Sequence, residues 1–134
     1  MIKQGEKYTH EVTFSQEQVE DFARITGDNN PIHINPEYAS KTIFGRPIVH
    51  GFLAGAVFSM VFGTLFPGEG TIYLMQEMKF TAPTFVNEPY KALFEVLEVN
   101  TEKNIGIIAC ILVNSKGEPC IIGTAKLKHK EQFV

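Results

Sequence analysis

The sequence has no excess of basic residues and only two cysteines. Its 12 lysines and arginines stand against 15 aspartates and glutamates, which gives a net charge of −3. A protein that binds the nucleic-acid backbone would carry a basic excess, so we expect no nucleic-acid partner. Cys110 and Cys120 match neither a zinc-binding pattern nor a disulfide framework, and we expect two reduced thiols in the core.

No secretory signal, internal repeat or low-complexity tract is visible. The absence of an apolar run after the first basic residue favours a cytoplasmic protein. The 134 residues, 44% of them hydrophobic, suit one globular domain over 1–134. A chain of this length buries roughly two-thirds of its unfolded surface, so it needs no metal ion or disulfide to fold. We expect no cofactor.

Residues 47–68 contain no charged side chain, and this stretch is long enough to raise the question of a membrane span. Prolines, glycines and His50 interrupt it, and the remaining chain is typical of a soluble α+β domain. A helix that is apolar on every side is otherwise a helix buried within its own protein. We therefore predict a buried helix over 50–66 and no membrane span.

The first part of the chain predicts a strand, a helix and a loop. Residues 6–13 alternate weakly, as a strand does. Ser15 and Gln18 stand three residues apart, as in a capping box, and predict a helix that ends at Gly27. Two prolines and three asparagines within 28–36 exclude both a helix and a central strand there.

The rest of the chain predicts one further short helix and four strands. The short helix covers 36–41, with proline in its first turn. Strands are predicted over 71–81, 90–99, 105–113 and 120–128. The last three form an antiparallel meander, and the nearly continuous apolar run of 105–113 is typical of a strand covered on both faces.

These elements predict an α+β architecture. One strand, helical material, an uncharged helix and four strands pack most economically as a curved antiparallel sheet wrapped around that helix. One sheet on one helix leaves the other sheet face and an edge strand exposed. A second copy of the chain would cover them, so we expect a homodimer or a higher homo-oligomer.

Asp28 and His33 are the first candidates for catalysis. They stand five residues apart in a loop that Pro31 and Pro36 make rigid, and rigid placement is what a catalytic group requires. A carboxylate can take a proton from water while an imidazole handles a second proton nearby. Asn30 supplies an amide that could orient either partner. The same residues also fit a helix-end carboxylate and a purely structural histidine.

The sequence disfavours covalent and metal chemistry. It contains no Gly-x-Ser-x-Gly elbow, and neither cysteine has a neighbouring histidine. The spacing of His10, His33, His50 and His129 is not that of metal ligands, so we expect no metal site.

The start of the uncharged helix is the second candidate region. Gly51, Gly55 and Ser59 recur every fourth residue and form a narrow stripe that either a neighbouring strand or a flat substrate group could approach. Free N–H groups near Gly51 would suit a carbonyl oxygen that gains negative charge. We expect a structural or capping role for His50, and Arg46 could meet an anionic ligand or a carboxylate.

Two motifs resemble a known family. Residues 22–33, followed by Ala39, resemble the hydratase-2 motif of the MaoC-like family, and 44–53 is similar to a later motif of the same family. The segments 70–74 and 80–86 also resemble that family's (R)-specific enoyl-CoA hydratases. The similarity runs from about residue 14 to the last strands.

The resemblance implies a hot-dog fold, in which a curved antiparallel sheet wraps around a long central helix. It implies (R)-specific hydration of trans-2-enoyl-CoA to (R)-3-hydroxyacyl-CoA and the reverse dehydration. The family's water-activating pair falls on Asp28 and His33, and its supporting asparagine on Asn30. The glycine whose N–H polarises the thioester carbonyl falls on Gly51, and a helix serine near the site on Ser59.

The partner implied by the resemblance is an acyl thioester of CoA, with acyl-carrier protein as the other possible carrier. Two alternatives stay open. The fold also supports acyl-CoA thioesterases, and a non-catalytic acyl-thioester binding module would share the fold as well. The chain departs from some relatives at Asn35, where they carry an acid two residues after the histidine.

Overall fold

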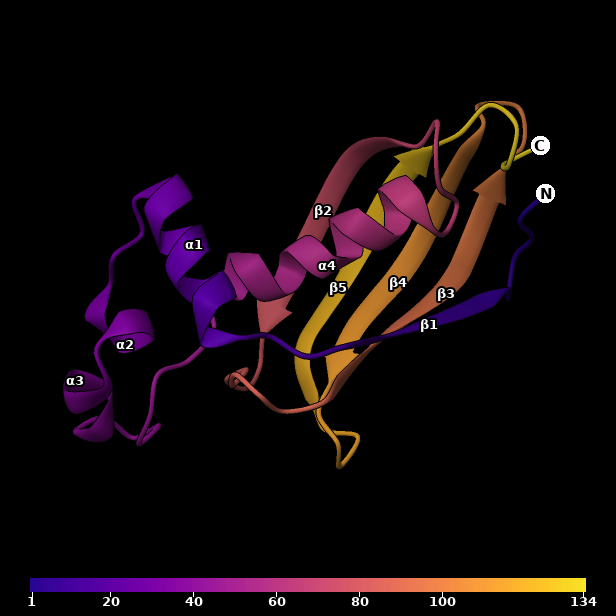
Figure 1. Cartoon of the computed structure of the whole chain (residues 1–134). Coiled ribbons are helices and arrows are strands. Elements are labelled where there is room, and N and C mark those ends of the chain that lie inside the picture. The colour runs from indigo at the N-terminus through magenta and orange to yellow at the C-terminus, as the bar shows by residue number, and fades with distance from the viewer.

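The computed structural model describes residues 1–134 and shows an antiparallel sheet curved around one long helix (Figure 1). The five strands follow the order β1-β3-β4-β5-β2. The elements are β1 (Lys7–Val12), α1 (Gln16–Thr26), α2 (Pro31–Ile34), α3 (Pro36–Ser40), α4 (Gly51–Thr64), β2 (Ile72–Phe80), β3 (Tyr90–Asn100), β4 (Ile105–Val113) and β5 (Pro119–Lys128). The predicted α+β arrangement and the meander of the last three strands are confirmed.

Helix α4 lies in the concave face of the sheet and forms the centre of the core (Figure 1). Its Phe58 and Phe62 rings pack edge-on against Phe94 of β3, with centroids 5.8 and 5.3 Å apart. The helix ends two residues earlier than predicted, because the chain turns back at Leu65 and Phe66, whose N–H groups both donate to the Val61 carbonyl. None of the helices combines the length and the apolarity that crossing a bilayer requires.

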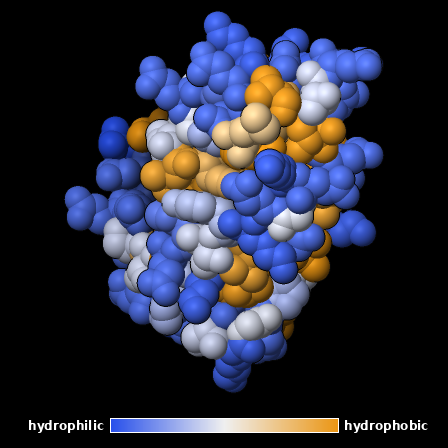
Figure 2. Space-filling view, turned by 90° about the vertical axis from the view of Figure 1, so that its right-hand side faces the viewer, coloured by the Kyte–Doolittle hydropathy of each residue, from blue (hydrophilic) through white to orange (hydrophobic).

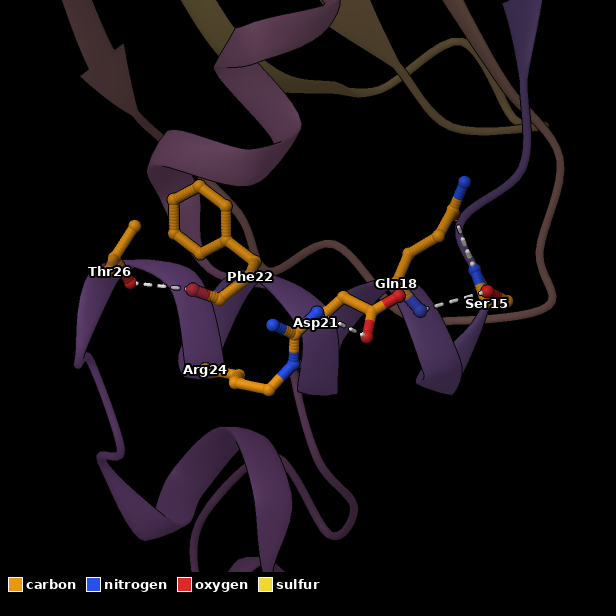
Figure 3. A network of polar contacts seen from close by, with 6 residues as sticks. All are labelled: Ser15, Gln18, Asp21, Phe22, Arg24 and Thr26. Atoms are coloured by element: carbon orange, nitrogen blue, oxygen red, sulfur yellow. Dashed lines mark hydrogen bonds and ion pairs between the residues drawn. The ribbon is translucent and has the colours of Figure 1, made fainter.

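Helix α1 begins and ends as its sequence predicts (Figure 3). Ser15 and Gln18 form the reciprocal capping box, with N···O distances of 3.1 and 3.0 Å. Gly27 takes the left-handed conformation, at φ 82°, and its N–H donates to the Ala23 carbonyl. The stop at Gly27 fixes where the following polar loop begins.

That loop is more regular than predicted. Residues 31–34 form the short helix α2, so the expected absence of helix within 28–36 is wrong there. Pro31 occupies the first helical position, where its missing N–H costs nothing, and Asn30 caps the turn. The turn ends at Asn35, whose side chain in turn accepts from the Tyr38 N–H and caps α3. Two consecutive asparagine caps therefore pin the segment after α1.

Strand β4 is less covered than predicted. Ile108, Cys110 and Leu112 are buried in the core together with α4, and Gly106 is buried beneath Phe133, but the alternate residues on the other face are only half-buried. That face has no second layer in the single chain, so coverage on both faces is not realised. Cys110 and Cys120 are buried free thiols, as expected.

The edge strand β2 exposes apolar side chains on both of its faces. Ile72, Leu74, Met75 and Phe80 are each between 43% and 56% exposed. By contrast, the end of the molecule where both termini lie is mostly hydrophilic, with small hydrophobic patches between polar residues (Figure 2). The β2 edge is thus the place where a single chain leaves apolar surface unpaired.

Candidate active site

A cavity of about 520 Å³ opens at the N-terminal end of α4, where α1, α2 and α3 gather (Figure 1). Its walls come from the loop after α1, from α2, from the connection before α4 and from the loop after β2. The lining residues are Asp28, His33, Phe44, Ile48, Val49, His50, Gly51, Phe52, Phe80, Thr81, Ala82, Pro83, Thr84 and Ile121. Asp28 carries the only formal charge among them.

Asp28 follows the left-handed stop of α1 and is held by a tight turn. Its N–H donates to Thr26 Oγ1 at 3.2 Å, and its Oδ1 accepts from the Asn30 N–H at 3.4 Å. The side chain is exposed in the single chain, at the rim of the cavity. One main-chain hydrogen bond leaves most of the carboxylate's accepting capacity free.

His33 is nearly buried, at 9% exposure, and its ring is fixed from one side. Nδ1 lies 2.8 Å from the Ile48 carbonyl oxygen. A carbonyl can only accept, so Nδ1 carries the hydrogen and Nε2 of the neutral ring carries a lone pair. Burial lowers the pKa of His33 below its ordinary value of 6.5, partly opposed by the bond to the Ile48 carbonyl. The structure therefore presents His33 as a proton acceptor.

The Ile48 carbonyl is itself held in place by two main-chain hydrogen bonds. The Ile48 N–H donates to Ile32 at 3.2 Å, and the Val49 N–H donates to Thr84 at 2.7 Å. The connection before α4 is thereby tied to α2 on one side and to the loop after β2 on the other. This explains how segments far apart in the sequence keep a fixed distance at the site.

Asn30 acts on the main chain and does not line the cavity. Its Oδ1 accepts from the Ile32 N–H at 3.2 Å, and its carbonyl accepts from the His33 N–H at 3.0 Å. The amide therefore orients the helical turn that carries His33, and its oxygen is already in use.

His50 fills the space between the site and helix α1. Its ring is 2% exposed and stacks on His33, with centroids 3.9 Å apart and planes 28° apart. The Phe22 ring packs on it at 4.8 Å, and its Nε2 lies 3.1 Å from the Asp28 carbonyl oxygen. His50 is the N-cap residue of α4 by position but makes no side-chain capping bond, so of the two expected roles its side chain takes the structural one.

Asp28, His33 and His50 bring three potential metal ligands within 4.8 Å of one another. Their arrangement does not suit a shared ion, because a ligating imidazole points its lone pair at the metal within the plane of the ring. Two rings stacked 3.9 Å apart with planes only 28° apart direct their lone pairs side by side. The cluster is better suited to holding a water molecule or a proton.

Gly51 opens helix α4 at the edge of the cavity, so its N–H has no partner within the helix. The positive end of the helix dipole lies at the same point. A Cβ on Gly51 would lie 2.7 Å from Cε1 of Phe80, which is 51% exposed. The absent side chain is what lets the Phe80 ring lie over the helix start.

Ser59 lies apart from this group. Two turns of α4 separate it from Gly51, about 12 Å along the helix axis. It lines a second hollow of about 380 Å³ together with Gly55 and residues of β2. Met78 occupies the stripe there, because a Cβ on Gly55 would lie 2.8 Å from its sulfur. The sequence left open whether a neighbouring strand or a substrate group approaches the stripe of Gly51, Gly55 and Ser59. In the single chain, side chains of β2 lie against it.

Arg46 meets a carboxylate. Its guanidinium pairs with Glu88 at 2.5 Å and lies over the Phe85 ring, 3.9 Å from the centroid. The hydrogen bond from Arg46 lowers the pKa of Glu88. Arg46 thus braces the loop after β2 instead of lining the cavity.

Comparison with known proteins identifies the family. A family model described as MaoC like domain matches residues 1–111. An (R)-specific enoyl-CoA hydratase of Aeromonas caviae is 35% identical over 127 residues, which cover 95% of each chain. The chain belongs to the MaoC-like family. An (R)-specific enoyl-CoA hydratase of Rhodospirillum rubrum is 37% identical over 102 residues, 76% of this chain and 71% of the relative.

Solved structures of MaoC-like relatives have the same fold. The structure of an (R)-hydratase from Aeromonas caviae involved in PHA biosynthesis has a TM-score of 0.92 and 34% identity, covering 96% of this chain and 97% of that one. R-hydratase PhaJ1 of Pseudomonas aeruginosa gives the same TM-score and identity over 98% of this chain and 84% of that one. The predicted hot-dog fold is confirmed.

The MaoC-like motifs locate part of the site and miss the rest. Of the predicted site residues, Asp28, His33 and Gly51 line one cavity, while Asn30 and Ser59 do not. The Ile48 carbonyl and the Phe80 ring were not predicted. Both depend on contacts between segments far apart in the chain, and the only sequence signals near them were the family-like segments 44–53 and 80–86, which contain Ile48 and Phe80.

Proposed function

We propose that this protein catalyses the (R)-specific hydration of trans-2-enoyl-CoA to (R)-3-hydroxyacyl-CoA, and the reverse dehydration. The observation that carries the proposal is the meeting of Asp28, His33 and the free N–H of Gly51 in one cavity. The relatives are (R)-specific enoyl-CoA hydratases, and this reaction needs a base, a group that positions water and a donor to the thioester carbonyl. Neither a cofactor nor a metal is required, since water is the second reactant.

Gly51 polarises the substrate in this proposal. Its N–H donates to the thioester carbonyl oxygen, and the dipole of α4 stabilises the negative charge that the oxygen gains as water adds. Withdrawal of electrons through the carbonyl makes C3 of the enoyl group electrophilic. The cavity walls around Gly51 are largely apolar, which strengthens this interaction by excluding water.

Asp28 and His33 hold the attacking water. Asp28 removes one proton as the C3–O bond forms, and Nε2 of His33 accepts a hydrogen bond from the second hydrogen. The proton that Asp28 removed then passes to Nε2 of His33, which is free to accept it, and His33 delivers it to C2 as the enolate collapses. The other hydrogen of the water stays on the new C3 hydroxyl, so Asp28 and His33 both return to their starting states. Dehydration is the same sequence reversed.

We assign the acyl chain to the stripe beyond Gly51. Gly55 and Ser59 lie further along the same face of α4 and line the second hollow. Met78 and Phe80 cover the stripe in the single chain, and neither side chain is buried: Phe80 is 51% exposed and Met78 is half-buried. An acyl chain would displace them and contact Ser59.

We further propose a homodimer through the edge strand β2. The exposed apolar residues of β2 and the half-covered outer face of β4 match what a second copy would bury. Leu74→Lys is expected to give a monomer by light scattering, while Lys116→Glu in the exposed β4–β5 turn leaves the dimer intact. A wild-type monomer at micromolar concentration would contradict this proposal.

Crotonyl-CoA tests the reaction directly. Hydration removes the enoyl absorbance without releasing free thiol, and chiral analysis of the product gives (R)-3-hydroxybutyryl-CoA. Release of free CoA would instead identify a thioesterase. Tight binding with no turnover would identify a non-catalytic binding module. The same assay with the enoyl group on acyl-carrier protein separates the two carriers.

A further inference from the structure

His50 contacts Asp28 and His33, the two side chains that handle protons in the proposed reaction, but it does not touch the substrate in that proposal. Its Nε2 lies 3.1 Å from the Asp28 carbonyl oxygen, and its ring stacks on His33. It also directly precedes Gly51, whose N–H faces the thioester. The His50 side chain therefore contacts Asp28 and His33, and its main chain leads directly into Gly51.

The hydrogen bonds of the two rings define their tautomers. The Asp28 carbonyl accepts, so Nε2 of His50 carries the hydrogen. His50 Nδ1 is then a buried lone pair with no partner. His33 has the opposite tautomer, with its hydrogen on Nδ1 toward Ile48. A buried polar atom without a partner is costly, which argues that this ring is retained for what its other atoms hold.

We propose that His50 is a positioning residue that fixes Asp28 through a main-chain hydrogen bond and fixes the His33 ring by stacking. The Phe22 ring packs on His50 at a tilt of 53°, so the three rings form one cluster that connects α1 to α2. Asp28 and His50 are the titratable groups that face His33, and the remaining cavity wall is uncharged. The stack holds the His33 ring with Nε2 toward the water. This inference rests on the proposed function for its kinetic part only.

Two substitutions separate the two contacts. His50→Gln keeps an N–H that can reach the Asp28 carbonyl but removes the ring, so water reaches His33. His50→Phe keeps the stack and removes the hydrogen bond. We expect each to lower kcat at least about 10-fold with a small change in KM, because a displaced catalytic group loses rate more than binding.

The pH dependence distinguishes positioning from a merely structural role. Burial lowers the pKa of His33 in the native protein. In His50→Gln, the pKa of His33 measured by NMR titration is expected to rise toward 6.5. In His50→Phe, the pKa is expected to stay below that value. His129→Gln is the matched control, since His129 is also buried and also bonded to a main-chain carbonyl. It is expected to change neither kcat nor the His33 titration.

If the variants do not fold, a measurement on the wild type still tests the tautomers that the proposal requires. Nitrogen-15 shifts are expected to report the hydrogen on Nε2 of His50 and on Nδ1 of His33. The reverse tautomer of His50, or a His33 titration that His50→Gln leaves unmoved, would overturn the proposal. Both readouts need no substrate, so they stand even if crotonyl-CoA is not hydrated and the proposed function fails.

Discussion

Two regions of this protein bury a histidine against a main-chain carbonyl, and they use it differently. At the C-terminus, His129 is 6% exposed and both of its ring nitrogens are occupied. Nε2 donates to the Glu69 carbonyl at 2.8 Å, and Nδ1 accepts from the N–H groups of Glu131 and Gln132 at 3.2 Å each. The ring connects the end of β5 to the loop after α4, and neither of its nitrogens is free to make another hydrogen bond.

At the start of α4, two buried histidines have an unused hydrogen-bonding nitrogen. His33 Nδ1 bonds to the Ile48 carbonyl but Nε2 makes no hydrogen bond, and Nδ1 of His50 has no partner. A saturated buried histidine stabilises the fold, while an unsaturated one facing a cavity is available to a reactant. Hydrogen bonding therefore distinguishes the saturated ring of His129 from the unsaturated rings of His33 and His50, since burial is similar in both regions.

Removing the His33 ring should give the largest difference between the two regions. His33→Ala is expected to lower kcat for crotonyl-CoA hydration by about 10³-fold, the usual range for loss of a proton-transfer group. Circular dichroism checks that the fold is kept. Turnover within 10-fold of the wild type would remove His33 from the mechanism.

Gly51→Ala should have a smaller effect. The new Cβ meets Cε1 of Phe80 at 2.7 Å, and an exposed aromatic ring can rotate away. We expect kcat to fall about 10-fold through misplacement of the carbonyl oxygen, which is below the cost of deleting an oxyanion donor. The double variant Gly51→Ala with Phe80→Ala should recover part of the loss. Unchanged kinetics in Gly51→Ala would contradict the expected misplacement of the carbonyl oxygen at the start of α4.

His129→Gln should lower stability and leave kcat almost unchanged, the opposite of the two substitutions at the cavity. Gln retains a donor toward Glu69 but leaves the N–H groups of Glu131 and Gln132 without an acceptor, at a cost of about 1–3 kcal/mol of unfolding free energy. Urea denaturation measures the loss, and kcat should stay within about 2-fold of wild type. A large loss of kcat with normal stability would contradict the structural assignment.

Acid should affect the site gradually. Burial lowers the pKa of His33, so the folded ring stays neutral below pH 6.5 while the unfolded ring takes up a proton. Stability from this group is therefore fully present above pH 6.5 and is lost as the pH falls through the lowered pKa. The kcat/KM profile should likewise keep its plateau at pH 6.5 and decline below it. An acid limb centred above 6.5 would show that His33 is not held as described.

Local signals in the sequence predicted the fold well. The capping box at Ser15, the stop at Gly27 and the alternating strands act over a few residues, and the structure confirms each of them. The helical turn at 31–34 was missed because Pro31 at its start and Pro36 just after it suggested a loop, although Pro31 at a first helical position favours the turn.

The site was predictable only in part. Asp28 and His33 share one short segment, so their motif brings them together. The Ile48 carbonyl, the stacked ring of His50 and the cover of Phe80 depend on packing between segments separated by 15 residues or more. No local pattern records which carbonyl a buried imidazole will meet.

The most direct test of the account is hydration of crotonyl-CoA by Asp28→Asn, with Asp21→Asn as its control. Both residues are exposed aspartates, but Asp21 lies in the middle of α1, pairs with Arg24 on the helix surface and does not line the cavity. Asn keeps the shape of the side chain and the turn at Asn30 while removing the base. We expect a loss of about 10³-fold in kcat for Asp28→Asn and none for Asp21→Asn. Equal activity in the two variants would contradict it.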